Sequence, residues 1–186
     1  SRTSASSRFY PVRPSTWRSM ATYRAFDRGV EINGRTVLTV VEETMGRFSG
    51  EYRDRALAAL AEEGIDDPDP DEWYPQQAWL NAFETIADDL QTHVLDRIGE
   101  RLPRVADWPN DFDTVPEGLR SIDDAYRRNH RGGEIGSYRL ERVDERTGEL
   151  VCHNPYPCPF DRGLVRGVAQ QYTPVDSFVL VEETGT

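Results

Sequence analysis

The chain has 186 residues, a hydrophobic fraction of 37% and a formal net charge of −11 at pH 7, a composition that indicates a folded acidic protein and excludes a disordered one. All 22 basic residues are arginine, which is typical of a protein adapted to concentrated salt (halophilic) or of one encoded by a GC-rich genome. The acidic balance excludes nucleic acid as the expected partner, because phosphate groups bind to basic surfaces. No apolar run approaches the roughly 20 residues of a membrane span, so we expect no membrane partner.

The amino-terminal 28 residues differ from the rest because they carry six arginines and a single acid, Asp27. Their Ser/Arg/Pro-rich start lacks the apolar centre of a secretory signal, and Met20 reads as a natural start. We therefore expect residues 1–19 to be a flexible extension and residues 20–186 to form one domain. Two cysteines give little basis for a disulfide scaffold, so a reduced, cytoplasmic protein is expected.

Residues 30–63 contain a turn signal followed by helix signals. The Asn33-Gly34 pair favours a turn, and the apolar run at residues 36–41 predicts either a short strand or an early helix. The Ala/Leu/Glu/Arg-rich run at residues 50–63 predicts a helix that Ser49 can cap.

A long amphipathic segment follows. Apolar residues recur at spacings of three and four from Tyr74 to Leu102, which predicts one long core helix that starts at Pro75 and stops near Pro103. His93 lies beside the apolar face. It is a candidate haem or metal ligand, and the alternative is an ordinary surface or partly buried histidine.

The second half of the chain changes from helix signals to strand signals. Thr114 and Glu117 form a capping box that predicts a helix, and the period-two pattern at residues 136–145, followed by an RTGE turn and the returning residues 150–154, predicts a β-hairpin. Asp161 can cap one more helix, and residues 175–183 read as a final strand. An N-terminal helical part followed by a hairpin, a helix and a strand predicts an α+β fold packed as one domain.

Two cysteines and a histidine make a candidate metal site. Cys152, Cys158 and His130 carry the thiolate and imidazole groups that zinc prefers. The alternatives are that the cysteines are small buried apolar residues, or that Cys158 is a nucleophile at a helix N-terminus with His130 or His153 as its base.

Three segments carry a resemblance to known proteins: "YPQQAWLNAFETIADDLQTHVLDRIGERLP", "SIDDAYRRNHRGGEIGSY" and "CHNPYPCPFDRGLVRGVA". They resemble a prokaryotic (haloarchaeal) family with NHRGG-x-IG-x-Y and NPYPC-x-FDRG motifs, and the likeness covers about Trp73 to Tyr172. The layout also resembles the 4-vinyl reductase domain, which shares its architecture with the haem nitric-oxide-binding domain and with a vesicle-tethering (TRAPP) subunit family.

The resemblance implies an α+β domain with an apolar pocket between helices and sheet, used to bind or sense small molecules. Some relatives hold zinc near the Cys-Pro-Phe turn, and Cys158 matches that position. The haem branch uses a Tyr-x-Ser-x-Arg motif that "SYRLER" does not match, so the resemblance gives no expectation of haem.

We therefore predict a small-molecule-binding or sensory domain, with a small apolar molecule and a second copy of the chain as candidate partners. The sequence identifies no catalytic residue and no reaction. The alternatives are a zinc-binding or cysteine-dependent enzyme centred on Cys158, and a structural protein that docks through its arginine-rich start. The predicted pocket is lined by Trp79, Phe83, Leu90, Tyr126, Tyr138 and Phe160.

Overall fold

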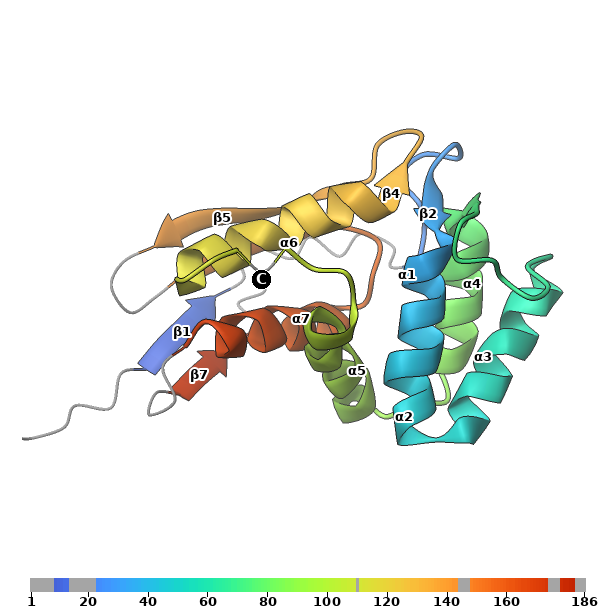
Figure 1. The fold of residues 1–186 in the computed structure, drawn as a ribbon, viewed down its shortest axis with the longest axis horizontal. Coiled ribbons are helices and arrows are strands. Elements are labelled where there is room, and N and C mark those ends of the chain that lie inside the picture. The colour runs from blue at the N-terminus through green and yellow to red at the C-terminus, as the bar shows by residue number, and fades with distance from the viewer. Residues whose placement is uncertain (1–8, 14–22, 110, 144–147, 174–177, 183–186) are drawn as a thin grey trace, which may run out of the picture.

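The computed structural model describes residues 9–13, 23–109, 111–143, 148–173 and 178–182. The fold is α+β, as the sequence predicts: helices account for most of the described elements, and the strands form two small sheets. Figure 1 shows α1 (Gly34–Leu38), α3 (Gly50–Glu62) and α4 (Gln76–Ala87) gathered at one end of the molecule. Among the described helices, none combines the length and the apolar character that crossing a bilayer requires.

The Asn33-Gly34 pair starts a helix rather than a hairpin. Strand β2 (Glu31–Asn33) ends at Asn33, whose side chain accepts a hydrogen bond of 2.8 Å from the backbone N–H of Arg35 and caps α1. The apolar run at residues 36–41 is therefore helical, the second of the two predicted alternatives. The helix widens into a π-helical segment, η1 (Thr39–Met45), and ends in α2 (Gly46–Phe48).

The prediction of one long helix from Tyr74 to Leu102 is wrong. Residues 73–75 form strand β3 (Trp73–Pro75), and the rest divides into α4 and α5 (Thr92–Val105). The break follows Ala87, where the backbone N–H groups of Asp89 and Leu90 bond three residues back and tighten the last turn. The break lets α5 leave the direction of α4 and pack along α7 (Cys158–Gln171), the most extensive contact between two elements.

The strand pairing of the predicted hairpin is confirmed, whereas Arg146 and Thr147 of the predicted RTGE turn lie outside the described residues. Strands β5 (Ser137–Val143) and β6 (Gly148–His153) pair antiparallel, with Tyr138 opposite Cys152 and Leu140 opposite Leu150. Helix α6 (Val115–Asn129), capped by Thr114 as predicted, precedes the hairpin, and strand β7 (Phe178–Val181) follows α7. A three-stranded sheet in the order β3-β2-β4 includes β4 (His130–Arg131).

The expected flexible extension, residues 1–19, contains a strand. Residues 9–13 form β1 (Phe9–Arg13), which lies between β6 and β7 and pairs parallel with both, giving the sheet order β5-β6-β1-β7. This strand pairs its backbone on two sides, which is not expected of a free tail. Residues 1–8 and 14–19 lie outside the described residues.

The contact between α5 and α7 depends on glycine and on one buried acid. A Cβ atom on Gly163 would overlap the backbone carbonyl of Asp96, and one on Gly99 would overlap that of Phe160. The two helices can therefore approach backbone to backbone. The buried Asp96 carboxylate joins them further, because it accepts a 2.5 Å hydrogen bond from Arg162 Nε and pairs with Arg166.

Candidate functional site

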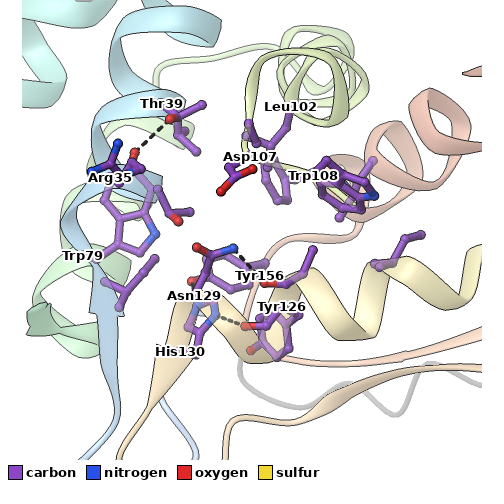
Figure 2. Close-up of a pocket in the computed structure, with 18 of the residues that line it drawn as sticks. Arg35, Thr39, Trp79, Leu102, Asp107, Trp108, Tyr126, Asn129, His130 and Tyr156 are labelled. Carbon is purple, nitrogen blue, oxygen red and sulfur yellow. Dashed lines mark hydrogen bonds between the residues drawn. The ribbon is translucent and has the colours of Figure 1, made fainter. Parts of the chain in front are cut away.

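A cavity opens where α1, the start of η1 and α4 face α5, α6 and α7 (Figure 2). Its volume is about 80 Å³. Most of the lining is apolar or aromatic. The lining residues are Ile32, Arg35, Thr36, Thr39, Val40, Trp79, Phe83, Leu102, Ala106, Asp107, Trp108, Ile122, Ala125, Tyr126, Asn129, His130, Tyr138, Tyr156, Phe160 and Leu164.

The walls of the cavity are aromatic rings that support one another. Trp79 and Phe83, one turn apart on α4, stack with centroids 5.4 Å apart. Phe83 meets Phe160 of α7 edge to face at 5.5 Å, and Tyr126 of α6 meets Tyr138 of β5 in the same way at 5.2 Å. The carboxyl-terminal half therefore folds back onto α4, and the space between the rings is bounded by rigid side chains.

The floor of the cavity is a hydrogen-bonded pair, His130 and Tyr156. His130 Nδ1 lies 2.9 Å from the backbone carbonyl oxygen of Tyr126, which can only accept, so Nδ1 carries the proton. His130 Nε2 then accepts a hydrogen bond from the Tyr156 hydroxyl at 2.8 Å. Burial lowers the pKa of His130 to about 4, against a smaller opposing effect of the Tyr126 carbonyl. The imidazole is therefore neutral at neutral pH.

Gln76 lies behind the floor. Its side chain is fully buried, and its Nε2 donates to the Tyr156 hydroxyl at 3.4 Å. Burial raises the pKa of Tyr156, and the neighbouring side chains of Gln76 and Trp79 oppose that rise. Within the described part of the chain, Gln76 Oε1 has no hydrogen-bond partner, so this edge of the floor keeps one unused acceptor.

A second buried network fixes Tyr138. Its hydroxyl donates to Asp161 Oδ1 at 2.6 Å, and Asn154 Nδ2 donates to Asp161 Oδ2 at 2.9 Å. The predicted capping role of Asp161 is wrong, because α7 begins at Cys158 and Asp161 lies inside its first turn with its side chain buried. The carboxylate instead ties the hairpin, the turn and α7 into one unit.

The mouth of the cavity is polar. We use this name for Arg35, Thr36, Thr39, Asp107 and Asn129, which come from α1, η1, the segment after α5 and the end of α6. Arg35 Nη2 is bound to Asp71 Oδ1 at 2.9 Å. Figure 2 shows the Asp107 carboxylate directed toward the open space between Thr39 and Asn129.

Five of the six residues predicted for the pocket line this cavity: Trp79, Phe83, Tyr126, Tyr138 and Phe160. The sixth, Leu90, lies elsewhere, in a shallow depression between α3 and the end of α4. The break between α4 and α5 explains the difference, because a continuous helix would have kept Leu90 near the face of Trp79 and Phe83. Sequence reasoning missed Tyr156. Its signal was the proline-rich NPYPC turn, where a large aromatic residue is a natural anchor.

The three predicted zinc ligands, His130, Cys152 and Cys158, are not brought together as a set of metal ligands in the described part of the chain. Among the described residues, no group of three or more His, Cys, Asp or Glu side chains is placed to hold a metal ion. Both ring nitrogens of His130 are used in hydrogen bonds, which leaves no lone pair for a metal. Cys152 and Cys158 are not joined by a disulfide, and burial raises the pKa of Cys152, which disfavours its thiolate.

His93, the other candidate ligand, lies on the exposed side of α5 and outside the cavity lining.

No protein-family model, no curated protein and no solved structure matches the chain.

Proposed function

We propose that the protein binds a small, largely apolar molecule in the cavity between α4, α6 and α7. The observation that carries this proposal is the composition of the cavity, which combines aromatic walls with a polar mouth. Small-molecule sites are concave and mostly apolar, with a few polar groups that orient the ligand. The resemblance to the 4-vinyl reductase domain favours the same function, since it implies an apolar pocket.

The titratable rings of the floor and of the aromatic walls are uncharged. Burial raises the pKa of Tyr126, Tyr138 and Tyr156 and lowers that of His130, so all four groups are neutral at neutral pH. A neutral floor suits an uncharged, apolar body.

The test is binding of two uncharged probes, benzene and benzyl alcohol, by isothermal titration calorimetry and by the shift in melting temperature. Ala125 lines the cavity from α6, and Ala125→Leu places extra volume in it. We expect saturable binding to the unmodified protein and a loss of at least about tenfold in affinity in Ala125→Leu, equivalent to about 1.4 kcal/mol.

The matched control is Ala61→Leu, the same change at an exposed position of α3 away from the cavity, which should bind like the unmodified protein. Circular dichroism checks that both variants keep the fold. Absence of saturable binding to the unmodified protein, or equal binding by both variants, contradicts the proposal.

A further inference from the structure

The two charged side chains at the mouth differ in how they are paired. The Arg35 guanidinium is bound by Asp71, so its charge is already compensated. No cation pairs with Asp107 anywhere in the described ranges, and its carboxylate is directed toward the cavity opening (Figure 2). Of the two charged side chains at the mouth, the Asp107 carboxylate is therefore the one placed to pair with a charged ligand.

The interior adds no positive charge that would oppose a cation. The buried imidazole of His130 is neutral at neutral pH and hydrogen-bonds at both ring nitrogens, and its partner in the floor is the uncharged hydroxyl of Tyr156. Trp108 follows Asp107 in the chain and lines the same cavity, and Trp79 lines the opposite wall. Indole faces attract ammonium groups. The overall charge of −11 also raises the local concentration of cations.

We propose that the molecule bound in the cavity is an organic cation: an apolar body inserted between the rings of α4, α6 and α7, with an amine or ammonium head at the mouth beside Asp107. This inference rests on the proposed function, because it names the chemical class of ligand for the same cavity. Neutral and anionic molecules with the same apolar group should therefore bind more weakly than the cation.

Three probes with one ring and different heads test the proposal: benzylamine, benzyl alcohol and benzoate, titrated by calorimetry at neutral pH into the full chain. We expect benzylamine to bind more tightly than benzyl alcohol and benzoate to bind most weakly. Asp107→Asn should weaken benzylamine binding about two- to fivefold, the range of a solvent-exposed ion pair, and leave benzyl alcohol binding unchanged. Added salt should reduce the preference for benzylamine.

The matched control is Asp124→Asn on α6, an exposed acid outside the cavity lining, which should change none of the three affinities. A second variant, Asp71→Asn, removes the partner of Arg35 and should raise the affinity for benzoate relative to benzylamine. Equal binding of benzylamine and benzyl alcohol, or an unchanged preference in Asp107→Asn, overturns the inference and leaves the proposed function standing. If none of the three probes binds, the proposed function itself fails.

Discussion

The contact between α5 and α7 and the region around the cavity are packed in opposite ways. At the first, Gly99 and Gly163 remove the side chains that would separate the helices, so backbone lies against backbone. At the second, rings meet edge to face, as Phe83 and Phe160 do with centroids 5.5 Å apart. Small residues let two helices close completely, whereas rigid rings held by one another cannot collapse into the space between them. The position of the cavity therefore follows from the distribution of residue sizes.

The buried ion pair gives the largest expected effect in this comparison. Asp96→Ala removes the carboxylate that Arg162 and Arg166 share, in a contact where the side chain of each is about a quarter exposed. We expect the free energy of unfolding to fall by about 3–4 kcal/mol, since Asp96 is the buried acid of this network and Glu100, 3.7 Å from Arg166 Nη1, offsets only part of the arginine charge.

Urea denaturation measures this loss. The control is Asp89→Ala, which breaks a half-exposed pair with Arg55 and should cost less than about 1 kcal/mol. Equal losses of unfolding free energy in the two variants would show that Asp96 stabilises the α5–α7 contact no more than an exposed acid does.

On the cavity side, the largest effect is a dependence of stability on pH. The pKa of His130 is about 4 in the folded protein, below its ordinary value of about 6.5 in an unfolded chain. Between these values the unfolded chain binds a proton that the folded protein does not. The free energy of unfolding therefore falls by up to about 3 kcal/mol as pH decreases from about 6.5 to about 4. Above pH 6.5 the histidine is neutral in both states, and none of this stability is lost.

The measurement compares denaturation of the unmodified protein and of His130→Gln at several pH values in this window, because the many carboxylates also titrate at acid pH. The part of the pH dependence that is due to His130 is the difference between the slopes of unfolding free energy against pH in these two proteins. His93→Gln, at an exposed position, should retain the slope of the unmodified protein. A slope that is the same in all three proteins contradicts a buried, neutral His130.

A methyl group at the glycine contact should have a somewhat smaller effect. In Gly163→Ala the new Cβ overlaps the backbone of α5, and we expect a loss of about 2–3 kcal/mol from overpacking. Gly50→Ala on α3 is the matched control, because a Cβ atom there meets nothing within 4 Å. It should be neutral or stabilise by up to about 1 kcal/mol through helix propensity. The melting temperatures of both variants are measured by thermal denaturation. A clear decrease in Gly163→Ala alone shows that the close approach of the helices outweighs the gain in helix propensity.

The smallest expected effect is at the floor. Tyr156→Phe removes the donor to His130 Nε2 and should cost about 1–2 kcal/mol, because a buried acceptor is left without a partner. The ring and the shape of the cavity remain, so benzene affinity should stay within about twofold of the unmodified protein. A large loss of benzene binding would mean that the hydroxyl network, and not the rings, maintains the cavity.

Local signals in the sequence were sufficient wherever a short motif decides the structure. Thr114 caps α6 because its hydroxyl reaches the N–H of Glu117, and the alternation of apolar and polar residues predicted the two paired strands in which Tyr138 lies opposite Cys152. Aromatic residues at helical spacing correctly placed Trp79 and Phe83 on one face of α4.

Features that depend on distant contacts were not predictable in this way. The break after Ala87 has no proline or glycine to mark it, and it is stabilised by the packing of α5 on α7. His130 has the chemistry of a metal ligand, yet Tyr156, which lies 26 positions away, uses its lone pair. The charge of the mouth depends on Asp71 binding Arg35 across 36 positions, a pairing that spacing along the chain does not reveal.

The placement of the tryptophan residues should make ligand binding detectable by intrinsic fluorescence. Of the three tryptophans that the structure describes, Trp79 and Trp108 line the cavity, whereas Trp73 lies under the guanidinium of Arg131 at 4.2 Å. A ligand that enters the cavity would displace water from beside Trp79 and Trp108 and would not change the surroundings of Trp73. Emission at longer wavelengths should therefore diminish on occupancy, and acrylamide should quench the remaining fluorescence less efficiently.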